Sequence, residues 1–265
     1  MKKERLDEAL VRLQYADTPE LARAIIMEGR VFQNGNRLDK PAILLASDVG
    51  LTVKGDKLPY VSRGGLKLEK AIAAFGLTFE GKTCMDVGSS TGGFTDCMLQ
   101  KGAQKVYAVD VGYGLLDWKL RNDPRVVVME RTNARLLNPE MTGGERMDFA
   151  SMDVSFISIR TVLPAVRTCM KENAHLAVLV KPQFEARREQ VGKGGIVRDP
   201  KVHREVLETV IAAMPAIGLV PQGLTVSPIK GVGGNTEFLL HLTNTKLNDA
   251  AFQAERAIED VLRFV

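Results

Sequence analysis

The chain has 265 residues and a formal net charge of +4, and its residues are 45% hydrophobic, 26% charged and 6% aromatic. This composition is typical of a globular protein and argues against a collagen-like, coiled-coil or disordered chain. Apolar runs such as 42–46 and 176–180 are much shorter than the ~18 residues of a membrane-spanning helix, so we expect no stable membrane insertion. The charge permits an anionic partner but does not identify one.

The N-terminus and the cysteine pattern indicate a compartment. Residues 1–5 are charged and lead into an amphipathic segment, whereas a secretory signal has ~7–15 apolar residues there. The three cysteines show no Cys-x-x-Cys spacing and imply neither a disulfide framework nor a thiolate metal site. The three histidines are scattered, with no spacing typical of metal ligands. We therefore predict a cytoplasmic protein without a bound metal.

Residues 1–59 differ in pattern from the rest of the chain and are predicted to form a separate small module. Apolar side chains recur at helical spacing over 6–13 and again over 21–26. Thr18 suits the N-cap of the second helix and Pro19 its first turn. The elements expected after it are a helix end at Gly29, a strand over 31–33, a turn at Asn34-Gly35 and a strand over 49–53.

This module resembles a known RNA-binding fold. The resemblance is carried by Arg5-Leu6-Asp7 and by segments 21–26 and 29–35. They are similar to the αL module of a small-subunit ribosomal protein and of many pseudouridine synthases, in which the helical pair grips structured RNA. The alternative is that its arginines only solvate helix faces, because residues 1–59 hold 10 Lys and Arg against 9 Asp and Glu. The resemblance implies phosphate contacts from Arg5, Arg23 and Arg30.

From Tyr60 onward, helical and strand patterns alternate. Such alternation is typical of a mostly parallel, doubly wound sheet that is covered on both faces. Two β patterns around Gly231–Gly234 predict an antiparallel hairpin at the sheet edge. The expected elements are helix 66–75, strand 83–87, helix 94–101, strands 105–109, 126–130 and 147–153, helix 159–170, strand 175–181, helix 202–214, hairpin strands 224–229 and 237–242, and a terminal amphipathic helix over 248–265.

A glycine-rich turn follows the first strand of this region. Residues 84–94 run from an apolar strand into the turn and then into a helix, which places a ligand at the carboxyl edge of the sheet. Ser90 stands at the position of the middle glycine in the dinucleotide fingerprint G-x-G-x-x-G. Because that glycine admits the pyrophosphate to the backbone, a nicotinamide or flavin cofactor is disfavoured. The turn instead resembles the first motif of class I S-adenosylmethionine methyltransferases. This resemblance implies a cofactor site that includes Asp86, Gly88, Ser89, Gly92, Gly93 and Phe94.

Two further polar residues follow the next strands at the same edge. Asp110 ends strand 105–109, where a carboxylate can accept both hydroxyls of a ribose. This role is common to nucleoside cofactors and does not choose between S-adenosylmethionine and NAD. Asn133 follows strand 126–130, where the adenine ring of such a cofactor is expected. A role as the cap of the next turn explains an asparagine at this position almost as well.

Four charged residues are expected near this edge of the sheet: Lys67, Asp153, Lys181 and Glu237. Lys181 stands out among them, because it ends an apolar strand, where a charge is costly unless it is paired or solvated. In their order along the chain the four match the Lys-Asp-Lys-Glu set of FtsJ-like RNA 2′-O-ribose methyltransferases. With segments 60–68, 153–158, 179–185, 192–200 and 233–238, they resemble the TlyA, or haemolysin A, family over nearly the whole chain.

The TlyA resemblance implies S-adenosylmethionine-dependent 2′-O-ribose methylation of ribosomal RNA, with cytidine as the nucleoside and ribosomal RNA or ribosomal subunits as partners. It implies an α/β class I methyltransferase, with a Rossmann-like sheet, over 60–265 and a small α+β RNA-binding domain before it. A ribose hydroxyl is a poor nucleophile, so the reaction needs a base and alignment. Lys181 is the candidate base or orienting group, Lys67 and Glu237 are candidates for alignment, and Asp153 is the candidate acceptor.

Segment 183–200 is rich in basic residues and glycine, and we expect a mobile loop that closes over RNA phosphates. The alternative is an ordinary solvated connection, although loops of this length are uncommon without a function. The candidate RNA-binding residues are Arg187, Arg188, Lys193 and Arg198, and Arg63 extends the same basic track.

Other functions compete with this interpretation. The family name suggests a membrane-lytic haemolysin, but the sequence shows neither a signal peptide nor a long apolar span. A non-catalytic RNA-binding assembly factor is a second alternative, and the complete set of four charged residues argues against it. A small-molecule or protein methyltransferase is a third, because a fold does not determine a substrate.

Overall fold

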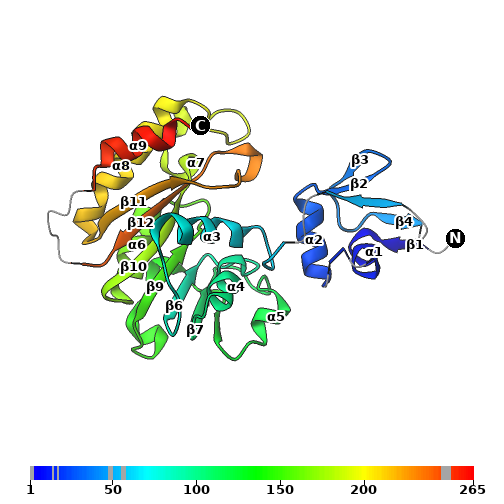
Figure 1. The fold of residues 1–265 in the computed structure, drawn as a ribbon, viewed down its shortest axis with the longest axis horizontal. Helices are drawn as coiled ribbons and strands as arrows, with labels where there is room; N and C mark the ends of the chain where they lie inside the picture. Colours follow the sequence, from blue (N-terminus) through cyan, green and yellow to red (C-terminus); the bar gives the residue numbers. More distant parts are fainter. Residues whose placement is uncertain (1–2, 14, 17, 47–49, 55–57, 246–251) are drawn as a thin grey trace. The chain divides into compact units, whose positions relative to one another are not determined.

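The chain divides into two compact units, Met1–Ser62 and Arg63–Val265 (Figure 1). The structure is a computed structural model that describes residues 3–13, 15–16, 18–46, 50–54, 58–245 and 252–265. The boundary expected from the sequence, after residue 59, lies just before this division. Residue 49 of one expected strand and residues 248–251 of the expected terminal helix lie outside the described residues.

The first unit contains the two expected helices, α1 (Leu6–Arg12) and α2 (Pro19–Met27). The Thr18 side chain accepts a hydrogen bond from the Leu21 N–H at 3.2 Å, so Thr18 caps α2 as predicted. Three antiparallel strands follow in the order β3-β2-β5, at Asn36–Leu38, Val31–Gln33 and Leu51–Val53. The antiparallel pair β1 (Lys3–Arg5) and β4 (Leu44–Ala46) was not predicted, because neither strand shows an alternating pattern, whereas strand 31–33 was marked by the adjacent Asn34-Gly35 turn.

The second unit is built on one seven-stranded sheet with the order β11-β12-β10-β9-β6-β7-β8. The five strands from β10 to β8 are parallel, and β12 is antiparallel to both β10 and β11. The predicted fold class is therefore confirmed, with its antiparallel hairpin at one edge. The strands are β6 (Thr83–Val87), β7 (Lys105–Val109), β8 (Val126–Met129), β9 (Met147–Met152), β10 (Met170–Val180), β11 (Val220–Val226) and β12 (Phe238–Thr243).

Helices cover both faces of this sheet (Figure 1). One face carries α6 (Ile159–Thr168), α8 (Pro200–Ile217) and α9 (Ala254–Leu262), and the other carries α3 (Gly64–Phe75) and α4 (Gly93–Gln100). Successive side chains of β12 point to opposite faces of the sheet. Leu240 and Leu242 belong to the core beneath α6 and α8, whereas His241 stacks on Phe75 of α3. Short helices α5 (Trp118–Arg121) and α7 (Pro182–Glu185) follow β7 and β10.

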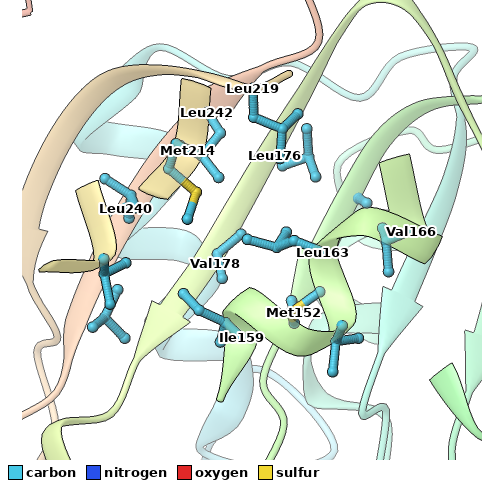
Figure 2. Close-up of a cluster of buried hydrophobic side chains, with 14 of the residues drawn as sticks. Met152, Ile159, Leu163, Val166, Leu176, Val178, Met214, Leu219, Leu240 and Leu242 are labelled. Atoms are coloured by element: carbon cyan, nitrogen blue, oxygen red, sulfur yellow. The ribbon is translucent and has the colours of Figure 1, made fainter. Parts of the chain in front are cut away.

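The core between α6, α8 and the sheet consists of tightly packed aliphatic and methionine side chains (Figure 2). Met152, Val178 and Leu240 come from three adjacent strands. Leu163 and Met214 are fully buried against them from the helices. This core holds the carboxyl ends of β9 and β10 in place, and residues after both strands form part of the site described next.

Two strands begin earlier than the sequence predicts. β10 begins at Met170 instead of residue 175, and its register shifts between Met170 and His175. The exposed, polar segment 171–173 hides this part of the strand from a search for apolar runs. β11 begins at Val220 instead of residue 224, with a second shift between Pro221 and Gly223. Proline is tolerated there because β11 is the edge strand.

Candidate active site

The four charged residues singled out from the sequence lie side by side in the structure. Lys67 Nζ lies 2.8 Å from Glu237 Oε2 and 3.1 Å from Asp153 Oδ2. Lys181 Nζ lies 2.5 Å from Asp153 Oδ1. The side chains thus form a chain of alternating charge, in the order Glu237, Lys67, Asp153 and Lys181.

The topology of the sheet explains why they meet. Asp153 and Lys181 follow directly after the parallel neighbours β9 and β10, so both stand at the carboxyl edge. Glu237 precedes β12, and antiparallel pairing of Val180 with Phe238 brings it to the same edge. Lys67 reaches the group from the first turn of α3.

All four side chains are largely buried, and the most exposed of them, Asp153, retains 19% of its side-chain surface. Burial disfavours the Lys67 ammonium, but the attraction of Asp153 and Glu237 outweighs burial and raises the pKa of Lys67. Burial likewise disfavours the Asp153 carboxylate, and the two neighbouring ammonium groups outweigh it and lower the pKa of Asp153. Lys67 and Asp153 therefore stay ionised at neutral pH, which makes Lys67 unsuitable as a base.

A cavity of about 580 Å³ adjoins this ion-pair chain. Asp153 and Ser155 lie in its wall, and the Ser155 Oγ accepts a hydrogen bond from Lys181 Nζ at 3.0 Å. Its volume lies within the range of pockets for small molecules and cofactors. The remaining lining residues are Gly88, Ser90, Val109, Asp110, Val111, Leu115, Thr132, Asn133, Ala134, Arg135, Val154, Phe156, Ile157 and Val162.

Three of the eight predicted cofactor residues line this cavity: Gly88, Asp110 and Asn133. Asp110 is held by the backbone, since its Oδ2 accepts the Ser90 N–H at 2.8 Å and its Oδ1 accepts the Gly112 N–H at 2.7 Å. The Asn133 side chain accepts the Arg135 N–H at 3.1 Å and caps a short 3₁₀ helix, Ala134–Leu136. Asn133 therefore both caps the turn and lines the cavity.

The other five predicted cofactor residues lie outside the cavity lining. Asp86 is 1% exposed, and its carboxylate accepts hydrogen bonds from the Thr95 N–H and hydroxyl and from the Ser151 hydroxyl. Burial raises the pKa of Asp86 to about 6 despite these bonds. The carboxylate thus ties β6 to α4 and β9 behind the turn. The remaining four are buried in the turn and the first residues of α4: Ser89, Gly92, Gly93 and Phe94.

Comparison with known proteins is consistent with this geometry. The FtsJ-like methyltransferase family matches residues 60–244, and the S4 domain family matches residues 4–48. The 16S/23S rRNA (cytidine-2′-O)-methyltransferase TlyA of Mycobacterium tuberculosis is 44% identical over 262 residues, which are 98% of this chain and 96% of that protein. The chain belongs to the TlyA family of FtsJ-like methyltransferases. The resemblance expected from the sequence is thereby confirmed, and the protein is a methyltransferase.

Other TlyA-family relatives carry the hemolysin name. Hemolysin A of Brachyspira hyodysenteriae is 44% identical over 89% of this chain and 98% of its own. A solved structure named as a candidate hemolysin from Streptococcus thermophilus is 46% identical, with a TM-score of 0.77 over 99% of this chain and 97% of that one. Within the described residues, no helix is both long and apolar enough to cross a membrane.

Ser155 and Phe156 also line the cavity of this TlyA-family enzyme, although neither is among the site residues predicted from the sequence. Phe156 is 91% exposed and has a φ of +64°, a conformation that is rare for a bulky residue and is concentrated at functional sites. Its ring centroid lies 5.1 Å from that of Phe184. The available signal was their place in segment 153–158, which belongs to the TlyA resemblance and follows a predicted strand, but no role for either residue could be assigned without the backbone angles.

In the S4 unit, two of the three predicted RNA-binding arginines share one buried partner. Arg5 Nη2 lies 2.8 Å and Arg23 Nε lies 3.2 Å from Asp7 Oδ2. Both arginine side chains remain nearly half exposed, whereas Asp7 is 2% exposed. Arg30 is mostly buried, and its Nε donates to the Lys54 carbonyl at 2.7 Å. Asp7 therefore holds the Arg5 and Arg23 guanidinium groups next to each other at the surface.

The basic segment expected to be a mobile loop is held in place over part of its length. It begins with α7 and a 3₁₀ helix at Arg188–Gln190, and a β-bridge joins Gly192 to Ile196. The Asn235 side chain then accepts the Val197 N–H at 3.0 Å and donates to the Gly195 carbonyl at 2.9 Å. The predicted RNA-binding residues on it are exposed: Arg187, Arg188, Lys193 and Arg198. Arg63 lies immediately before α3 and is half-buried.

Proposed function

We propose that this protein transfers the methyl group of S-adenosylmethionine to a ribose 2′-hydroxyl of ribosomal RNA, and that the methylated nucleoside is cytidine. The observation that carries the proposal is the buried chain of alternating charges at the wall of a cofactor-sized cavity. The named activity of the 44% identical TlyA of Mycobacterium tuberculosis supports the choice of substrate.

The cavity lining fits S-adenosylmethionine. The carboxylate of Asp110 is fixed by two backbone N–H groups and still has lone pairs to accept ribose hydroxyls. Apolar side chains, among them Val111, Leu115 and Ile157, suit the faces of an adenine ring. Gly88 lets the backbone approach the ligand without a side chain in the way. When bound, S-adenosylmethionine supplies an electrophilic methyl group.

The ion-pair chain then acts on the ribose. Lys181 orients the 2′-hydroxyl or accepts its proton during methyl transfer. Asp153 and Ser155 fix the position of Lys181 Nζ from two directions. Lys67 remains an ammonium group between two carboxylates, where it holds Asp153 and Glu237 in a single arrangement. Alignment of this kind is a large part of catalysis in displacement reactions.

Exposed groups in each unit suit an RNA substrate. Phe156 offers its ring at the edge of the cavity, and unstacked RNA bases are commonly held on aromatic side chains. In the S4 unit, Arg5 and Arg23 present adjacent cationic groups for phosphates. The exposed Arg187, Arg188, Lys193 and Arg198 supply further positive charge on the methyltransferase unit.

The test is incubation of the purified protein with tritiated S-adenosylmethionine and separate 30S subunits, 50S subunits and naked ribosomal RNA. We expect label in at least one of these substrates, and mass spectrometry of the digested RNA should show 2′-O-methylcytidine. Label on a base would overturn the proposed reaction, and label on the ribose of another nucleoside would overturn the cytidine assignment. No label in any substrate would favour a non-catalytic role.

A further inference from the structure

Glu185 is a buried carboxylate for which the proposed reaction has no role. Its side chain is 2% exposed and lies at the end of α7, four residues after Lys181. Its Oε1 accepts the Ile159 N–H at 2.7 Å, and its Oε2 accepts the Ser158 hydroxyl at 2.7 Å. Arg160 Nε approaches the same carboxylate at 3.4 Å.

These partners belong to the first turn of α6, where the backbone N–H groups have no acceptor within the helix. A carboxylate is also favoured at a helix N-terminus by the helix dipole. Burial raises the pKa of Glu185, while the Ser158, Ile159 and Arg160 donors oppose that rise. The carboxylate is thus well matched to the beginning of α6 and joins it to the segment that carries Lys181.

Five contacts connect segment 153–159 with segment 181–185. Lys181 meets Asp153 and Ser155 at one end, and the Phe184 and Phe156 rings lie 5.1 Å apart in the middle. Glu185 closes the series at α6. The segment between Asp153 and α6 holds Phe156 in its strained positive-φ conformation, which persists only where the surroundings enforce it.

We infer that Glu185 is a positioning residue, which holds segment 153–159 against segment 181–185 so that Lys181 and Phe156 stand in their working geometry. This inference rests on the proposed function for its effect on methylation, but the link itself is independent of activity. Glutamine at this position has one carbonyl oxygen for two donors, and its NH₂ group would face a donor. Glu185→Gln should therefore loosen the connection without a large change in side-chain volume.

The test compares Glu185→Gln with Glu208→Gln, a control at a half-exposed ion pair on α8. Hydrogen exchange should accelerate in segment 153–159 of Glu185→Gln only. The kcat for methylation should fall about 10–100-fold, as for other small misplacements of catalytic groups. The affinity for S-adenosylmethionine should fall by a smaller factor than kcat, since only part of the cavity lining lies in segment 153–159. The variant should still unfold in one cooperative transition, which a general loss of folding would not allow.

Ser158→Ala provides a second and milder variant in case Glu185→Gln does not fold. It should lower kcat, and its effect should be less than multiplicative with Glu185→Gln, because both changes break the same link. Unchanged exchange in segment 153–159, or faster exchange with a wild-type kcat, would overturn the positioning role. A wild-type protein that methylates no RNA would overturn the proposed function instead, and the exchange result would still decide whether Glu185 holds the two segments together.

Discussion

The backbone of Gly88 lies directly against the carbonyl group of Asp153. A Cβ atom built on Gly88 would be 2.5 Å from that oxygen, closer than real Cβ atoms approach. The contact arises because β6 and β9 are parallel neighbours, with Val87 opposite Met152, so the turns after the two strands meet. The glycine turn and the ion-pair chain are thus mechanically connected.

Gly88→Ala should therefore impair both cofactor binding and methylation. We expect the affinity for S-adenosylmethionine to fall by about tenfold or more, equivalent to about 1.4 kcal/mol, measured by calorimetry. Gly81→Ala is a matched control, since Gly81 also has a positive φ, of +69°, but a Cβ there meets nothing within 4 Å. If both variants lose affinity equally, backbone strain and not the Asp153 contact is responsible.

Lys181→Ala should separate binding from chemistry. Lys181 is not among the residues that line the cavity, so the dissociation constant for S-adenosylmethionine should change little. Methyl transfer to RNA should fall by at least about 10²-fold, because the candidate base or orienting group is removed. The two values come from calorimetry and from single-turnover transfer of tritiated methyl groups. Near-wild-type turnover in this variant would refute the assignment of Lys181.

Lys67→Met should lower both stability and activity. The change removes the ammonium that Glu237 faces and leaves a buried carboxylate, which typically costs about 3–5 kcal/mol. The double variant Lys67→Met/Glu237→Gln should regain much of that stability in urea unfolding but no methylation. Activity that returns together with stability would assign the pair a structural role alone.

His241 should make the methyltransferase unit sensitive to acid. Its ring stacks between Phe75 and His175 and shares a 3.0 Å hydrogen bond with His175 Nδ1. Burial, and then the His175 charge, lower the pKa of His241 to about 4. Burial and the nearby Lys82 also lower the pKa of His175.

The unfolded chain binds a proton on such a histidine near pH 6.5 and the folded chain does not, so stability is lost as the pH falls from about 6.5 towards 4. His241→Gln should reduce the decrease in the free energy of unfolding over this pH range by up to about 3 kcal/mol, because one pKa unit corresponds to 1.36 kcal/mol. Urea unfolding at pH 8 and pH 4.5 measures the difference. An equally steep pH dependence in the variant would contradict a neutral, buried His241.

Arg23→Ala should weaken RNA binding uniformly. Loss of one phosphate contact should reduce the slope of log affinity against log salt by about 1. Arg12→Ala is the control in the same unit, because Arg12 forms its ion pair with Glu4 and has a similar exposed fraction. Filter binding to ribosomal RNA over a range of salt concentrations gives both slopes. Equal slopes for the two variants would argue against a specific contact from Arg23.

Much of the fold was predictable from the sequence. Strands 83–87 and 105–109 have the predicted bounds, because each is a compact run of mostly apolar residues that ends at the sheet edge. The order of Lys67, Asp153, Lys181 and Glu237 along the chain indicated a site at this edge. Their distances follow from parallel and antiparallel strand pairing, and their catalytic roles stay predictions.

Residue types, spacing and the order of elements were therefore determined by the sequence itself. Only the tertiary structure decided which side chains face each other across long stretches of chain. Examples are the hydrogen bond of Asp86 to Thr95 and the hydrogen bond of Glu185 to the first turn of α6. Another is the pair of contacts that Asp7 makes with Arg5 and Arg23. The tertiary structure also brought the scattered His175 and His241 to 3.0 Å. The physical reason is that strand register and helix packing set these contacts, and both depend on side chains distant in the sequence that local patterns do not report.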